Sequence, residues 1–251
     1  MNYQSDIFNR AAIYDMLFFN VKSVLEYPTL FDLQTSKPEM YDNWLSIISE
    51  KYNDSNLPLE KLYKEYAVNY PEYCRIITIT YGKVYMNETA GKMDRVLKKI
   101  TGENETIILE TFFDVLNNMN DNITFCSFNG FKDIQNIVKR FIYRRSEVNT
   151  IKIIPLSIKK VLSLKPWESG VIDINSVWKF NCYECGVPEL SIISSFLGLK
   201  KTVQLMSNND LSKYYWEKIE NFPDDTLKNI ELQSINETNI LIQFINEIRT
   251  L

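Results

Sequence analysis

The stretch MLFFNVKSV at residues 16–24 decides the fold. It is a short apolar run, far below the roughly 18 residues that a membrane-spanning helix needs. A run of this length is typical of a buried strand, and we expect it at the centre of a sheet. RIITITY at 75–81 is rich in β-branched residues and predicts a second strand, which Gly82 joins to residues 83–87 in a hairpin. A further strand is expected at 122–127, and a shorter one at 170–174.

Apolar residues at helical spacing occupy most of the remaining chain. The helical stretches are 39–69, which holds two helices with the second starting after Pro58, and 105–119, 133–144, 189–197 and 224–248. Strands and helices therefore alternate, and the class is α/β with a mixed central sheet flanked by helices. We expect one domain over residues 1–251, with a helical insertion at about 39–69.

Composition excludes several classes of protein. The chain has 251 residues, a net charge of −4 and a pI of about 5.2, so it is not a basic nucleic-acid coat. The amino-terminal residues lack a signal-peptide layout, and we expect a cytoplasmic protein with no membrane contact. Histidine is absent, which excludes a Ser/His/Asp triad, a Cys/His pair and any His-ligated metal. Abundant Asn and Ile suggest an AT-rich genome.

Four cysteines are present: Cys74, Cys126, Cys182 and Cys185. Most of them sit in or beside apolar stretches, where cysteine is typically a small buried hydrophobe. Cys182 and Cys185 form a CxxC, but zinc needs four ligands and no second pair lies at metal spacing, so zinc is disfavoured. Reduced thiols fit synthesis in the cytoplasm.

Four segments follow one another in an order and spacing that are similar to those of one family. They are YPEYCRIITITYGKV at 70–84, NGFKDIQNIVKRF at 129–141, LKPWESGVIDINSVWKF at 164–180 and YYWEKIENFPDDTLKNIELQSI at 214–235. The chain resembles the predicted 3′–5′ exonucleases related to the proofreading exonuclease domain of family-B DNA polymerases. The resemblance covers about residues 16–245 and implies a DnaQ-like, RNase H-like fold.

The resemblance also implies a chemistry. Family members hydrolyse phosphodiesters with two divalent ions, Mg²⁺ in the usual case, that four carboxylates hold. Asp and Glu at i and i+2 of the first strand point to one face and reach the same metal pair. A third acid follows an Asn-Gly turn. The fourth lies on the last helix, four residues after a tyrosine that orients the attacking water.

This sequence departs from the family pattern at these positions. Asn20 stands where the strand Asp is expected and Lys22 where the Glu is expected. Asp133 keeps an acid after the Asn-Gly turn, with one residue fewer between them. On the last helix Ser234 replaces the Asp and Ile230 replaces the tyrosine. Three of four ligands are therefore lost, and Asp133 is the one metal ligand that could remain.

Lys22 argues most strongly against catalysis, because an ammonium group repels Mg²⁺ at short range. The alternative is that the true acids lie nearby, at Asp15, Glu26 or Asp32, but none has a partner acid two residues away. Asp133 is interpreted equally as a metal ligand or as the N-cap of the following helix. We further predict that Lys22, if buried, pairs with Asp133 or with a backbone carbonyl, since a buried charge needs a partner.

Basic residues cluster on the helix that contains Asp133: Lys132, Lys139, Arg140, Arg144 and Arg145. They form either a phosphate grip or a solvated face, and the overall acidity favours the solvated face. Asp173 matches a family acid, for which a structural role is favoured.

The function expected from these features is that of a pseudo-exonuclease, an inactive homologue without metal that serves assembly or binding with protein partners. A phage virion or replication component fits the genome character. The alternatives are an active Mg²⁺-dependent exonuclease with a rearranged site, and a module that binds single-stranded nucleic acid without cleavage.

Overall fold

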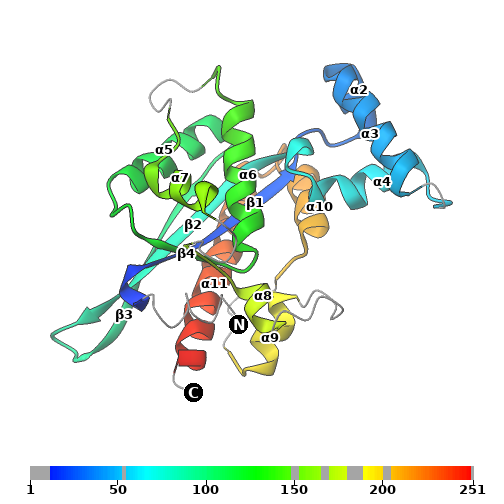
Figure 1. Cartoon of the computed structure of the whole chain (residues 1–251). Helices are drawn as coiled ribbons and strands as arrows, with labels where there is room; N and C mark the ends of the chain where they lie inside the picture. Colours follow the sequence, from blue (N-terminus) through cyan, green and yellow to red (C-terminus); the bar gives the residue numbers. More distant parts are fainter. Residues whose placement is uncertain are drawn as a thin grey trace.

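The computed structural model describes residues 12–52, 55–147, 153–164, 170–179, 189–199 and 205–249. Over these ranges the chain forms a five-stranded sheet with helices on both faces (Figure 1). The α/β class and the flanked mixed sheet that the sequence predicts are therefore confirmed.

The sheet has the strand order β3-β2-β1-β4-β5. β1 pairs antiparallel with β2 and parallel with β4, β3 is antiparallel to β2, and β5 is parallel to β4. The predicted central strand at 16–24 is thus confirmed as the middle of the sheet. The bounds are β1 (Met16–Leu25), β2 (Cys74–Asn87), β3 (Lys92–Thr101), β4 (Thr124–Ser127) and β5 (Val171–Asp173).

The hairpin predicted at Gly82 is wrong, because β2 runs straight through this residue. The chain turns later, near Gly91, whose φ of +61° is a conformation that glycine adopts at little cost. A Cβ at position 82 would lie 2.8 Å from the carbonyl oxygen of Val96, so Gly82 instead permits the close approach of β3. The strand β3 itself was not predicted.

The helices occur where the apolar periodicity places them, with additions. The helices are α2 (Leu30–Ser36), α3 (Pro38–Lys51), α4 (Leu59–Tyr66), α5 (Glu105–Asn117), α6 (Gly130–Tyr143), α7 (Leu156–Ser163), α8 (Ile174–Trp178), α9 (Leu190–Phe196), α10 (Asn208–Lys218) and α11 (Pro223–Arg249), with short 3₁₀ turns η1 (Ile13–Asp15), η2 (Ala67–Asn69) and η3 (Pro71–Tyr73). Of these, α2, α7, α8 and α10 are not among the predicted helices, and Ile174, expected at the end of a strand, begins α8.

Alternation along β1 separates the two faces of the sheet. Leu17 and Phe19 pack in the core beneath α5, α6 and α7. Phe18 packs on the opposite face against α9 and α11, and Val24 does so against α10 and α11. The polar residues Asn20 and Lys22 lie on the same face of β1 as Phe18 and Val24, because they occupy alternate positions along the strand. Their side chains therefore point toward α11.

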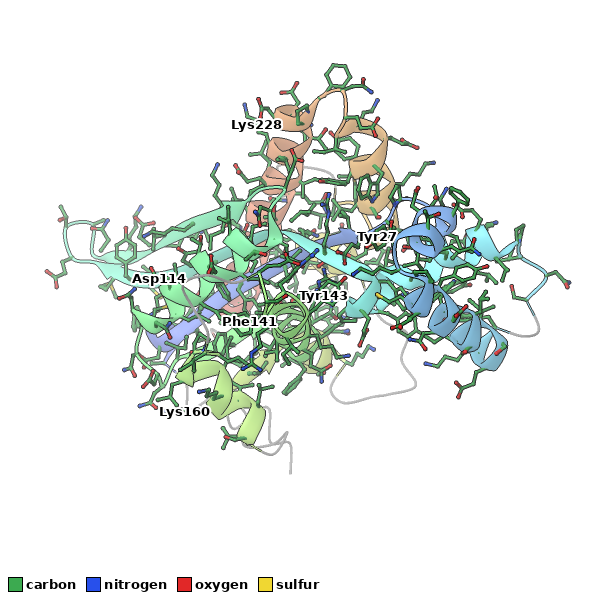
Figure 2. All side chains as sticks on the ribbon, turned by 90° about the horizontal axis from the view of Figure 1, so that it is seen from above. Tyr27, Asp114, Phe141, Tyr143, Lys160 and Lys228 are labelled. Atoms are coloured by element: carbon green, nitrogen blue, oxygen red, sulfur yellow. The ribbon has the colours of Figure 1, made fainter. Side chains whose placement is uncertain are left out.

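The helical insertion α2–α4 surrounds Trp44, which is fully buried and makes edge-to-face contacts with Tyr63 and Tyr73. It lies at one end of the sheet, and the paired ends of β2 and β3 project at the other (Figures 1 and 2). None of the helices in the described ranges is long and apolar enough to cross a membrane.

Candidate functional site

Two polar side chains interrupt the apolar α11 face of β1. Asn20 is 6% exposed and Lys22 is 5% exposed. Because buried polar groups need hydrogen-bond partners, the fold must supply them from the helix above. α11 does so with Ser234 and Glu237, and Gln233 on the same helix binds Glu237 in turn.

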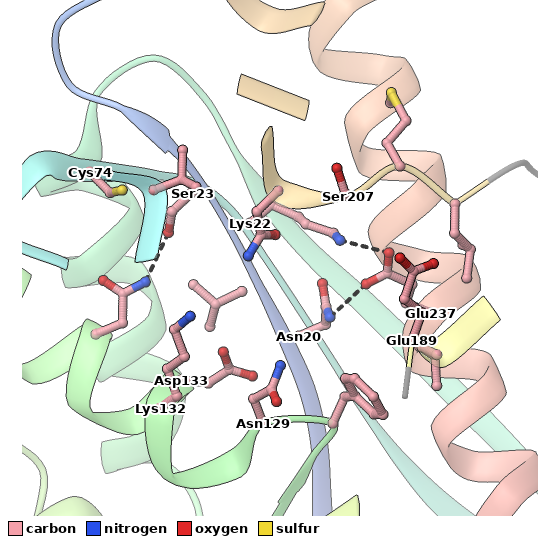
Figure 3. Close-up of a pocket in the computed structure, with 18 of the residues that line it drawn as sticks. Asn20, Lys22, Ser23, Cys74, Asn129, Lys132, Asp133, Glu189, Ser207 and Glu237 are labelled. Carbon is pink, nitrogen blue, oxygen red and sulfur yellow. Dashed lines mark hydrogen bonds and ion pairs between the residues drawn. The ribbon is translucent and has the colours of Figure 1, made fainter. Parts of the chain in front are cut away.

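Glu237 is the centre of this cluster. Lys22 Nζ lies 2.6 Å from Glu237 Oε1, and Asn20 Nδ2 donates to Glu237 Oε2 at 2.9 Å (Figure 3). Ser234 Oγ donates to Asn20 Oδ1 at 2.9 Å. Gln233 Nε2 donates to Glu237 Oε1 at 3.0 Å and to the carbonyl oxygen of Met206 at 3.1 Å, which ties the segment before α10 to the cluster.

Asp133 reaches the same region from α6, on the opposite side of β1 from α11 (Figure 3). Burial raises the pKa of the Asp133 carboxyl to about 7; the Ser127 hydroxyl, which donates to it, acts in the opposite direction, and the nearby Asp173 raises it further. The neutral form of this acid therefore persists to a higher pH than that of an exposed aspartate.

Two expectations for Asp133 are wrong. The N-cap of α6 is Asn129, and Asp133 lies inside the first turn. Lys22 does not pair with Asp133, because Glu237 offers its ammonium group a carboxylate at hydrogen-bond distance. The predicted need of buried Lys22 for a partner is met, but by a residue that the sequence reasoning missed.

These side chains surround one cavity of about 260 Å³. Asn20, Lys22, Lys132, Asp133 and Glu237 all line it, together with residues of α9 and of the segment before α10. Ser234 is fully buried behind Asn20. The fold thus brings together positions 20, 22, 133 and 234, which come from three distant parts of the sequence.

The side chains around the cavity do not fit a pair of Mg²⁺ ions. Mg²⁺ takes oxygen ligands in octahedral geometry. Here an ammonium group and an amide N–H already occupy the two oxygens of Glu237, and Asn20 Oδ1 accepts the Ser234 hydroxyl. Within the described ranges, no three Asp, Glu or Cys side chains lie close enough together to hold a metal ion.

Two further residues that the sequence resemblance singles out, Ile230 and Asp173, have structural roles. Ile230 is fully buried against Val24 and Ile77. Asp173 caps α8 by accepting from the Ser176 N–H at 2.9 Å, and it also accepts from backbone N–H groups at the start of α6. Its favoured structural role agrees with these contacts.

The basic residues of α6 are mostly paired within the protein. Arg140 is 1% exposed, and its guanidinium binds Glu105 at 2.6 Å and Glu26 at 2.8 Å. Arg144 joins the same two carboxylates, at 2.5 Å from Glu26 and 2.9 Å from Glu105. Arg140 is therefore neither a solvated cation nor a phosphate ligand, and Glu26 is committed to these arginines instead of a metal site.

Lys139 and Lys132 differ from the arginines. Lys139 Nζ lies 2.7 Å from Glu72 in a pair whose side chains are both 48% exposed. Lys132 lines the cavity. A contact between nucleic acid and Lys132 stays a prediction.

Sequence reasoning missed Glu237 and Gln233. Glu237 follows Ser234 by three residues, a spacing that places both on one helix face, and this was the available signal. Cys74 and Cys126 are buried free thiols, and burial raises the pKa of both. Cys182, Cys185 and most of the segment at 164–169 lie outside the described residues.

Comparisons with known proteins give no match. No family model matches the sequence, and no curated protein or solved structure shows significant similarity to the chain.

Proposed function

We propose that the protein is a catalytically inactive homologue of 3′–5′ exonucleases, with an RNase H-like fold that serves assembly or binding. A phage virion or a replication complex is the setting proposed for it. The proposal rests on the four ordered sequence segments, on the arrangement of the sheet and on the cluster beside β1.

The sheet supports the fold assignment. Its order is β3-β2-β1-β4-β5, and β2 alone runs antiparallel to the other strands. This is the arrangement expected of an RNase H-like sheet. The expected acid positions lie on the central strand β1, at the start of α6 and on α11, which agrees with the positions from which such a fold would build a metal site.

The observation that carries the proposal is the buried pair of Lys22 and Glu237. An ammonium group 2.6 Å from the carboxylate fills the place where a cation would bind, and both residues are at most 6% exposed. A divalent ion would have to displace Lys22 against like-charge repulsion of several kcal/mol at an intermediate dielectric. The fixed cluster therefore favours a scaffold over a hydrolase.

Nuclease activity tests the proposal directly. Single-stranded DNA labelled at its 3′ end is incubated with the protein and Mg²⁺ or Mn²⁺, and shortening is followed on a denaturing gel. We expect no shortening. Shortening that depends on metal, and that Glu237→Gln or Asp133→Asn removes, would refute the proposal; shortening that survives both variants belongs to a contaminant.

A second arm asks whether the lost acids explain the missing metal site. The triple variant Asn20→Asp, Lys22→Glu and Ser234→Asp adds three carboxylates beside Glu237. It should unfold at a lower temperature than the wild type without metal, and Mn²⁺ should restore part of the loss by mass action. A wild-type protein that Mn²⁺ stabilises as strongly as it stabilises the triple variant would contradict the proposal.

A further inference from the structure

A second group of positive side chains lies away from α6, on the ribbon formed by β2 and β3. Residues 83–101 contain five lysines or arginines and two acids, a net charge of +3 in a chain of net charge −4. The rest of the chain therefore carries −7. Such a local reversal of sign concentrates positive potential on one projecting element.

The ribbon is separate from the body of the sheet. β1 pairs with β2 only as far as Gly82, and beyond it β2 and β3 pair only with one another among the described strands. Figure 2 shows side chains standing out around this end of the molecule, opposite the helical insertion. The face of the ribbon that carries Val84 packs against α11, whereas Tyr85 on the opposite face is 44% exposed, so a partner can approach from that side.

The positive side chains of the ribbon are available to a partner. Lys99 pairs with Glu231, whereas Lys83, Lys92, Arg95 and Lys98 form no ion pair with any described residue. The register places Lys83 opposite Val96 and Tyr85 opposite Asp94. By strand alternation, Lys83, Lys92 and Lys98 share one face of the ribbon with Tyr85.

Exposed apolar side chains lie on both faces of the ribbon: Tyr85 and Val96 share the face of the three lysines, and Met86 and Met93 share the face of Arg95. The exposed fractions are 44% for Tyr85, 50% for Met86, 42% for Met93 and 46% for Val96. Lysines alone would suffice to protect an edge strand from aggregation. That role gives no reason to expose an aromatic ring beside them, whereas binding to unpaired bases does.

We propose that the β2–β3 ribbon binds single-stranded nucleic acid. Lys83, Lys92 and Lys98 contact successive phosphates on one face, and the Tyr85 ring stacks on a base between them. This surface is distinct from the cavity beside β1 and does not depend on the proposed loss of nuclease activity.

Fluorescence anisotropy with a labelled 20-nucleotide mixed-sequence DNA strand, and with its duplex, tests this. The variant Lys83→Gln/Lys92→Gln/Lys98→Gln is compared with the control Lys61→Gln/Lys64→Gln/Lys213→Gln, which removes three exposed lysines elsewhere. Both variants lose three positive charges, so a difference in their DNA affinity reports direct contact by the ribbon lysines and not the change in net charge. Circular dichroism checks that both fold.

The ribbon variant should bind the single strand at least tenfold more weakly than the control variant. Its plot of log K against log salt should be shallower by about 2, because each lost phosphate contact on a single strand is worth about 0.7. Tyr85→Ala should lower the affinity for the single strand about tenfold, as expected for one stacked base. Phe31→Ala removes an exposed aromatic ring on α2 and should leave the affinity unchanged.

Three results would overturn the inference. They are a wild-type protein that does not bind the strand at low salt, a control triple variant that loses as much affinity as the ribbon variant, and a duplex that binds as tightly as the single strand. The nuclease assay is read separately, so shortening of DNA would refute the proposed function and leave the ribbon site standing.

Discussion

Replacing Lys22 by Met should be among the most destabilising substitutions in this protein. It removes the ammonium group and leaves the Glu237 carboxylate, 6% exposed, with only neutral donors from Asn20 and Gln233. Removing one partner of a buried ion pair costs about 3–5 kcal/mol, because the other charge stays buried. For a chain of this size, each kcal/mol lowers Tm by about 2–4 °C, so a drop of roughly 10 °C is expected.

The assay is a double-mutant cycle by urea unfolding with Lys22→Met, Glu237→Gln and their combination. The double variant carries no buried charge, so it should lose less than the sum of the single losses, with a coupling energy above about 2 kcal/mol. Lys139→Met is the matched control. It breaks the pair with Glu72, in which both side chains are 48% exposed, and should cost no more than about 1 kcal/mol.

The reasoning fails if Lys22→Met costs no more than Lys139→Met, or if the cycle gives a coupling energy near zero. Either result would mean that the buried pair of Lys22 and Glu237 contributes no more to the free energy of unfolding than an exposed ion pair does.

Three other substitutions test separate features. The folded pKa of Asp133, about 7, lies above its unfolded value, so this acid stabilises the fold at low pH and that contribution is lost as pH rises toward 7. Between pH 4 and 7 the free energy of unfolding of the wild type should therefore fall, relative to that of Asp133→Asn, by up to about 1.4 kcal/mol per pH unit. A difference between the two proteins that stays constant with pH would contradict the raised pKa. Arg140→Met leaves Glu105 buried with one arginine fewer and should cost about 3–5 kcal/mol in urea unfolding, and a loss below 1 kcal/mol would show that the ion cluster is not stabilising. Gly82→Ala forces a Cβ against the backbone of β3 and should lower the free energy of unfolding by about 1–3 kcal/mol, whereas an unchanged Tm would mean that β3 can move away.

The elements with strong apolar periodicity could be predicted from the sequence. β1, α5 and α11 bury continuous faces, so their patterns reflect the structure directly. β3 reads KMDRVLKKIT, and its side chains are mostly exposed or half-buried, so an edge strand of this kind leaves no alternation to detect. Gly82 was misread because a glycine between two strand-like runs can mark either a turn or a close backbone approach.

The cluster was harder to predict than the fold. Family positions located Asn20, Lys22 and Ser234, but a sequence pattern cannot say which carboxylate a buried lysine will reach. Glu237 carries out a role for which the family pattern has no position. Arg140 shows the same difficulty in reverse, since the sequence of a basic helix cannot reveal that Glu105, on another helix, buries and pairs one of its arginines.

The pairing of Lys22 with Glu237 also constrains the evolutionary paths open to this chain. A single Lys22→Glu substitution would set two buried carboxylates against each other, and loss of Glu237 alone would leave the buried lysine without its partner. Either step passes through a poorly folded intermediate that selection would remove. An acidic site at this place therefore requires simultaneous changes on β1 and α11, so the cost of altering either residue alone preserves the pair.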